Sequence, residues 1–157
     1  MAGADTGPEG QSMIEPGRDA VEQTVRIAAR PQTVWRYWTE PERMCDWWAV
    51  AAEVDLRPGG LYWVDIAEGG TMRGEVVELV PYERFVFTFG WEKSHLAPEI
   101  VPGSTVVEVT FVEEAGDTVM TLRHTGLPRT LIDSHHAGWG HHLPLLIAAV
   151  EAAKKEA

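Results

Sequence analysis

The sequence predicts an α+β domain: a curved antiparallel sheet of six to seven strands wrapped around a long C-terminal helix, with two short helices after the first strand. Three observations carry this prediction. Apolar and polar residues alternate through most of positions 53–125, turn signals separate the alternating runs, and a helical spacing appears only near the C-terminus. Because strand follows strand with no helix between them, we expect antiparallel pairing.

The chain begins with a segment of unusual composition. Residues 1–18 are rich in Gly, Pro and acidic residues and contain few large apolar side chains, so they cannot bury enough surface to offset the entropy of ordering. We therefore expect a disordered tail followed by a single domain over residues 19–157. Apolar and polar residues then alternate between Ala20 and Ala29, which predicts a first, half-buried strand.

Two prolines follow this strand. Pro31 and Pro41 each suit the first turn of a helix, because the fixed φ of proline is compatible with that turn and its missing N–H would have no partner there. The sequence therefore predicts two short helices, within 31–38 and 41–48.

Turn signals rich in Gly and Pro divide the next part of the chain. Six further strands are predicted, at 53–57, 61–66, 72–80, 85–91, 104–112 and 118–125. The strand at 85–91 carries aromatic side chains at every second position, namely Phe85, Phe87, Phe89 and Trp91. One face of this strand is therefore expected to be buried or to line a cavity.

The two-residue period ends after the last of these strands. From about Thr130 to Lys155 the apolar residues Trp139, Leu143, Leu146 and Val150 follow one another at helical spacing. This pattern predicts a long amphipathic helix whose apolar stripe packs on the sheet. A curved sheet that grips one helix commonly leaves a cleft between the two.

Composition limits the classes of function. The 157 residues (17.4 kDa) are 45% hydrophobic and 24% charged, as in an ordinary globular domain, and the net charge of −11 disfavours nucleic-acid binding. A single cysteine, Cys45, forms no internal disulfide, which favours a cytoplasmic location. No apolar stretch is long enough for a membrane span.

Several short motifs follow one another in a characteristic order. They are Arg30-Pro31 with Val34-Trp35, Thr39-Glu40-Pro41, Trp47-Trp48, Leu56-Arg57-Pro58-Gly59-Gly60, Gly74-Glu75-Val76, Val80-Pro81, Leu122-Arg123-His124-Thr125-Gly126, and Gly138-Trp139 with Leu143. With these motifs in this order, the chain resembles members of the START-like superfamily, also called SRPBCC, over roughly residues 20–154. Within it, the chain is most similar to the family named after the C-terminal domain of the activator of the heat-shock-protein ATPase. The resemblance implies a helix-grip fold with a hydrophobic cavity.

The leading functional hypothesis is a protein that binds a hydrophobic or aromatic small molecule between the sheet and the last helix. The predicted ligand-binding residues are Trp48, Tyr62, Val64, Phe87, Phe89, Trp91, His124, Trp139, His142, Leu143 and Leu146. His124 and His142 would orient the ligand, although a hydrogen-bonded core histidine is the competing interpretation of His124. The inward direction of Tyr62 and Val64 is implied by the resemblance, because both faces of that strand are apolar.

Other functions stay open. A cyclase-like enzyme would use His124 as general acid or base. The resemblance also allows a chaperone-binding domain or a resistance protein that sequesters a natural product, and the chain is expected to be a monomer or a homodimer. No metal or other cofactor is expected, because the pairs His135-His136 and His141-His142 are 5 to 7 residues apart, and seven residues is about 10 Å of helix rise.

Overall fold

The computed structural model describes residues 20–93, 97 and 100–156, so the predicted tail at 1–18 lies outside the described residues. The strands are β1 (Ala20–Ile27), β2 (Ala51–Val54), β3 (Leu61–Asp65), β4 (Thr71–Val80), β5 (Arg84–Phe89), β6 (Trp91–Lys93), β7 (Thr105–Glu114) and β8 (Asp117–Thr125). The α-helices are α2 (Pro31–Thr39), α3 (Pro41–Met44) and α4 (Ile132–Glu156), and single 3₁₀ turns span Ala67–Gly69 and Arg129–Leu131.

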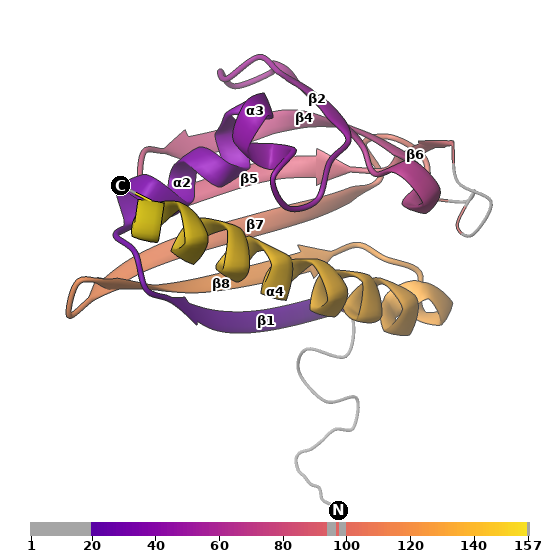
Figure 1. Cartoon of the computed structure of the whole chain (residues 1–157). Helices are drawn as coiled ribbons and strands as arrows, with labels where there is room; N and C mark the ends of the chain where they lie inside the picture. Colours follow the sequence, from indigo (N-terminus) through magenta and orange to yellow (C-terminus); the bar gives the residue numbers. More distant parts are fainter. Residues whose placement is uncertain (1–19, 94–96, 98–99, 157) are drawn as a thin grey trace, which may run out of the picture.

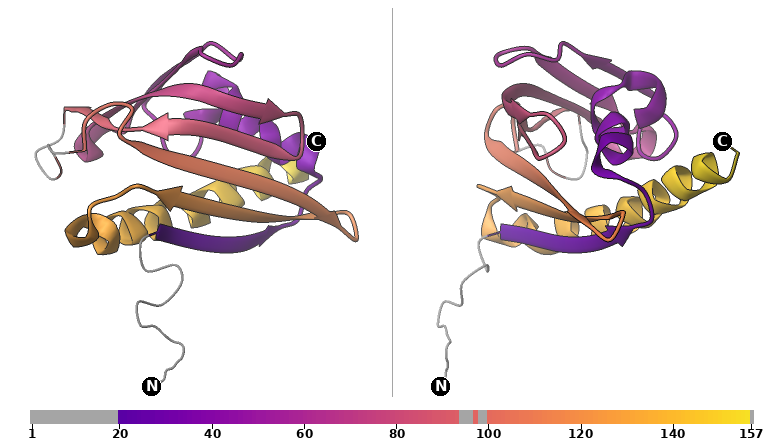
Figure 2. Two further views of the ribbon diagram at one scale, coloured as in Figure 1. Left: turned by 180° about the vertical axis from the view of Figure 1, so that it is seen from behind. Right: turned by 90° about the vertical axis from the view of Figure 1, so that its left-hand side faces the viewer.

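The strands form one antiparallel sheet in the order β1-β8-β7-β5-β4-β3-β2, with β6 paired to β4. The sheet curves around α4, while α2 and α3 lie over its other half (Figures 1 and 2). The α+β helix-grip prediction is therefore confirmed. None of the described helices is long and apolar enough to span a bilayer.

The described sheet has eight strands, not the six to seven expected, because the predicted strand 85–91 is divided at Gly90. The Gly90 carbonyl accepts the Arg73 N–H at 2.9 Å, and the Trp91 N–H donates to the Ile100 carbonyl at 2.6 Å. A Cβ on Gly90 would lie only 2.0 Å from the Val101 carbonyl oxygen. The chain thus turns at a close backbone approach, and Trp91 pairs with Met72 of β4.

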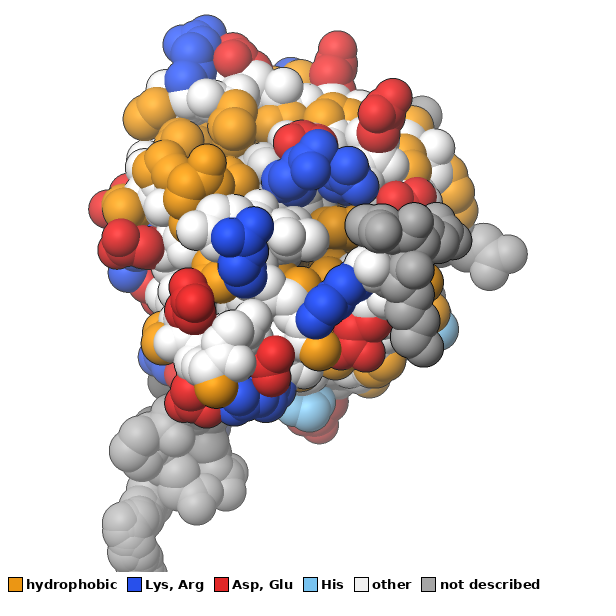
Figure 3. All heavy atoms as spheres, turned by 60° about the vertical axis from the view of Figure 1, so that its left-hand side comes forward, with side chains coloured by type: hydrophobic (Ala, Val, Ile, Leu, Met, Phe, Trp, Pro, Cys, Tyr) orange, Lys and Arg blue, Asp and Glu red, His pale blue; other side chains and the backbone are white. Residues whose placement is uncertain are grey.

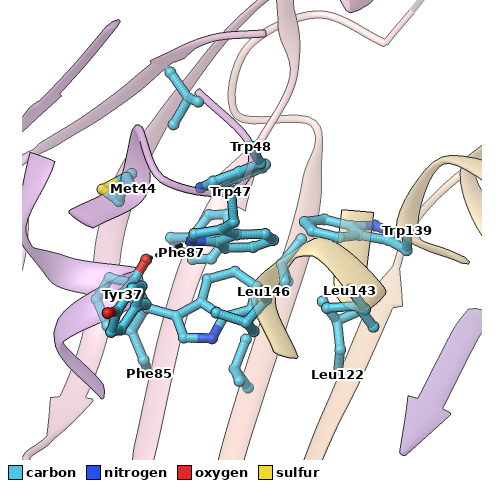
Figure 4. Packing of buried hydrophobic residues seen from close by; sticks show 14 of the residues in the cluster. Tyr37, Met44, Trp47, Trp48, Phe85, Phe87, Leu122, Trp139, Leu143 and Leu146 are labelled. Atoms are coloured by element: carbon cyan, nitrogen blue, oxygen red, sulfur yellow. Dashed lines mark hydrogen bonds between the residues drawn. The ribbon is translucent and has the colours of Figure 1, made fainter. Parts of the chain in front are cut away.

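Aromatic side chains fill the core between the sheet and the helices. The Trp38 ring of α2 lies 4.9 Å from that of Trp47 and 6.3 Å from that of Phe87, and Figure 4 shows Trp47 and Phe87 among the packed core side chains. Two polar groups in this part of the core are paired: the Tyr62 hydroxyl donates to the Trp38 carbonyl at 2.6 Å, and Trp47 Nε1 donates to the Tyr37 carbonyl at 2.8 Å. Ring contacts and hydrogen bonds together hold the side chains around Trp38 in place.

Candidate ligand-binding site

A pocket of about 170 Å³ lies between the first half of α4 and the curled end of the sheet. Its lining residues are mostly apolar and come from five separate segments: Trp48, Ile66, Gly69, Phe89, Trp91, Ala97, Ser134, His135, Gly138, Trp139 and His142. The curved sheet brings these segments together, and Phe89 at the end of β5 and Trp91 at the start of β6 both line the pocket.

The residues predicted to bind a ligand divide into three groups. Five line the pocket: Trp48, Phe89, Trp91, Trp139 and His142. Five lie in the packed core with at most 1% of their surface exposed: Tyr62, Val64, Phe87, Leu143 and Leu146. His124 does not line the pocket, but it accepts a hydrogen bond from the lining residue Trp139.

Sequence reasoning missed part of the α4 contribution. His135, Gly138 and His142 are three and four residues apart, so they form a second stripe beside the apolar stripe of Trp139 and Leu143. The spacing of these three residues carries this signal, but in the sequence His135 stands out only as part of a histidine pair that suggests a metal ligand. Among the described residues, no three His, Cys, Asp or Glu side chains converge to hold a metal ion.

Gly138 keeps the pocket open. A Cβ built on this residue would have no heavy atom within 4 Å apart from its own helix backbone and chain neighbours. Glycine in a helix interior costs about 1 kcal/mol relative to alanine. Gly138 therefore lowers the local stability of the helix, and its lack of a side chain leaves space in the pocket.

His124 is fully buried and both of its ring nitrogens are engaged. Trp139 Nε1 donates to Nδ1 at 3.1 Å, so Nδ1 carries the lone pair and Nε2 carries the proton. Nε2–H then donates to Thr105 Oγ1 at 2.9 Å, and that hydroxyl donates to the Phe89 carbonyl at 2.6 Å. Burial, with a smaller contribution from His135, lowers the pKa of His124 to about 3. The ring is thus neutral and positions Trp139 and Phe89, two walls of the pocket.

His135 makes a second indole–imidazole pair. Trp91 Nε1 donates to His135 Nε2 at 3.2 Å, which leaves Nδ1–H to donate to the Leu131 carbonyl at 2.9 Å. Burial lowers the pKa of His135, while the hydrogen bond to Leu131 opposes this shift. Two of the three tryptophans in the lining therefore have their N–H groups turned toward histidines.

The third tryptophan differs. Trp48 stacks on Trp47 with ring centroids 5.0 Å apart and lies 5.4 Å from Trp139. Its buried Nε1 has no hydrogen-bond partner among the described residues. An unpaired buried donor costs about 1–3 kcal/mol, so an oxygen on a bound ligand that reached this N–H would recover part of that energy.

His142 provides a polar group at the pocket. Its Nδ1 donates to the Gly138 carbonyl at 3.0 Å, so Nε2 carries the lone pair. Burial lowers its pKa, which favours the neutral ring. The pocket therefore combines aromatic walls with an acceptor that suits a ligand hydroxyl.

Comparison with known proteins identifies related sequences and folds. Residues 28–151 match the family described as Activator of Hsp90 ATPase homolog 1-like protein, whereas no curated protein matches significantly. The AHSA1-like protein RHE_CH02687 (1–152) from Rhizobium etli is 35% identical with a TM-score of 0.66, over 83% of this chain and 81% of that one.

Two more distant structures share the fold. DynU16, from the dynemicin biosynthetic locus, is 23% identical with a TM-score of 0.73, over 86% of this chain and 48% of that one. The chain thus spans about half the length of DynU16. The Aha1 dimer from Colwellia psychrerythraea is 18% identical with a TM-score of 0.72, over 84% of this chain and 96% of that one.

Proposed function

The chain belongs to the Activator of Hsp90 ATPase homolog 1-like family, and on this premise we propose that it binds a small apolar molecule in the pocket beside α4. The observation that carries the proposal is an aromatic-walled space that Gly138 leaves open. Two of the wall residues, Trp139 and Trp91, are held by hydrogen bonds to histidines, as expected for a preformed pocket.

Pocket size restricts the ligand. A volume of about 170 Å³ is close to that of a cavity of about 150 Å³ that holds benzene, and below the range of about 300–1,000 Å³ typical of drug-sized ligands. The pocket therefore suits one aromatic ring or a short branched chain. Because His142 Nε2 is an acceptor, a phenol is favoured over a plain hydrocarbon.

Filling the pocket from α4 tests the proposal. Gly138→Leu places a side chain in the open space and is expected to weaken p-cresol binding at least tenfold in calorimetric titration. Gly140→Leu is the matched control, since Gly140 is an exposed glycine of the same helix outside the lining. Both substitutions raise helix propensity by a similar amount. Equal losses in the two variants, or no binding of p-cresol to the parent protein, would overturn the proposal.

The role of His142 is tested by a pair of ligands. The parent protein is expected to bind p-cresol about threefold to tenfold more tightly than toluene, which is the effect of one net hydrogen bond. His142→Phe should abolish this preference while keeping toluene affinity within about twofold, because phenylalanine preserves the ring. Ligand-observed NMR measures both affinities. A preference that survives in the variant would assign the hydroxyl contact to another group.

The other predicted functions have less support in this geometry. Acid–base catalysis by His124 would require a free ring nitrogen near the ligand, whereas Trp139 and Thr105 already occupy both. A chaperone-binding role rests on family membership alone. Sequestration of a natural product would use the same pocket and is one form of the proposed binding function.

A further inference from the structure

A second concavity lies at the other end of α4. It has a volume of about 530 Å³ and opens where α2, α3, the last turn of α4 and the β7–β8 turn meet. Four cationic residues line it: Arg30, Arg36, Arg43 and Lys154. In Figure 3 the left-hand side of Figure 1 is turned toward the viewer. Several Lys and Arg side chains lie close together on this face, with Asp and Glu side chains among them. We call this concavity the cationic groove.

The charge of the groove contrasts with the rest of the chain. Four of the Lys and Arg side chains that the structure describes line it, although the net charge of the chain is −11. Glu40 lies beside the groove, where it pairs with Arg36 at 3.0 Å and with Arg43 at 3.3 Å. Glu151, also near the groove, accepts the Ala28 N–H at 3.1 Å. The lining that the structure describes thus contains four cations and no carboxylate, and the Asp117 carboxylate next to Gly116 is paired with Arg26.

Two cations of the groove have unused donors. Arg30 has no ion pair or side-chain hydrogen bond with any other described residue. Lys154 Nζ donates one hydrogen bond, to the Ala28 carbonyl at 3.0 Å, and an ammonium carries three donors. Arg26 is nearby in sequence but is held by Glu114 and Asp117. Arg30 and Lys154 therefore have donors available for a ligand.

Tyr37 supplies an independent indication of a ligand. Only 1% of the residue is exposed, yet it lines the groove, and its hydroxyl has no hydrogen-bond partner among the described residues and keeps some solvent-accessible surface. The Arg43 guanidinium lies 5.5 Å from the centre of its ring. The nine-residue helix α2 also begins at the groove, and its N-cap residue Arg30 provides no side-chain cap. The Tyr37 hydroxyl and the guanidinium groups thus lie together at the N-terminal end of α2.

We propose that the cationic groove binds a small, multiply charged anion of the phosphate class. Guanidinium groups match phosphate oxygens with paired donors, and two or more negative charges balance the excess of cations. The volume has room for an organic part beside the phosphate. His142 and Ala153 are about 16 Å apart along the helix axis, so the groove is a site separate from the apolar pocket.

Inorganic pyrophosphate is the probe that tests this proposal. Calorimetric titration at constant ionic strength, balanced with sodium chloride, should show saturable binding to the full chain. Citrate is the carboxylate comparison, and it is expected to bind more weakly. Citrate binding as tight as pyrophosphate binding would overturn the assignment to phosphate, and no saturable binding of pyrophosphate would overturn the site itself.

Three substitutions locate the site. Arg30→Gln is expected to weaken pyrophosphate binding about tenfold and Tyr37→Phe about threefold. Arg57→Gln is the control, since it removes the same charge from an exposed residue that pairs with Asp55 outside the groove. Its affinity should stay within about twofold of the parent value. Equal losses in Arg30→Gln and Arg57→Gln would show attraction by overall charge and overturn the proposal.

Discussion

Acidification from pH 6.5 toward pH 3 is expected to remove about 5 kcal/mol of stability through His124 alone. The unfolded chain protonates this residue near its ordinary pKa of 6.5, whereas burial lowers the folded pKa to about 3. Above pH 6.5 both states are neutral and the stability is fully present. Below that pH the unfolded state binds the proton first, so stability falls by about 1.4 kcal/mol per pH unit until the folded pKa is reached.

The hydrogen bonds of the His124 ring explain why protonation of this residue is unfavourable in the folded state. Protonation would require a hydrogen on Nδ1, where Trp139 already donates, and would place a charge beside Phe89 and His135. His135 and His142 also have lowered pKa values, so their contributions to acid sensitivity have the same sign.

Urea unfolding at pH 7, 6, 5 and 4 separates His124 from other groups. His124→Phe is expected to be less stable than the parent at pH 7 by about 1–3 kcal/mol, because the Trp139 N–H loses its acceptor. Below pH 6.5 the gap should narrow by about 1.4 kcal/mol per unit, since the variant lacks the titrating ring. His136→Gln, at an exposed histidine, should follow the parent. Parallel curves for parent and His124→Phe would contradict the argument.

Much of the fold could be predicted because its signals are local. Pro31 and Pro41 open α2 and α3, and the alternation of β7 and β8 survives in their burial patterns. The division at Gly90 could not be predicted in the same way, because the aromatic alternation continues to Trp91. Its cause is a contact with the backbone of Val101, eleven residues later in the chain.

The site was harder to predict than the fold. An apolar stripe identifies side chains that pack, and Leu143 and Leu146 accordingly lie in the core. A pocket depends instead on the absence of a side chain, here at Gly138. The spacing of apolar residues in a sequence does not show where such an empty space lies. The pairing of His124 with Trp139 likewise depends on how β8 faces α4.

Gly90→Ala is expected to destabilise the protein by about 3 kcal/mol or more. The new Cβ would meet the Val101 carbonyl oxygen at 2.0 Å and its carbon at 2.3 Å, and neither is the end of a flexible side chain. The backbone of residues 100–102 must therefore move, and this movement would disturb the hydrogen bond from the Trp91 N–H to the Ile100 carbonyl. Trp91 lines the pocket, so p-cresol affinity should fall together with stability.

Gly103→Ala is the matched control for Gly90→Ala. Gly103 has a φ of +82° but no atom within 4 Å of a Cβ position, so its substitution adds only the cost of a left-handed conformation, about 1–2 kcal/mol. Thermal and urea unfolding compare the two variants, and calorimetry compares their binding of p-cresol. If the close approach at Gly90 shapes the pocket, only Gly90→Ala should lose affinity. Equal destabilisation with unchanged binding would mean that the 100–102 segment yields to the new methyl group, and that the division of the aromatic strand does not hold Trp91 at the pocket.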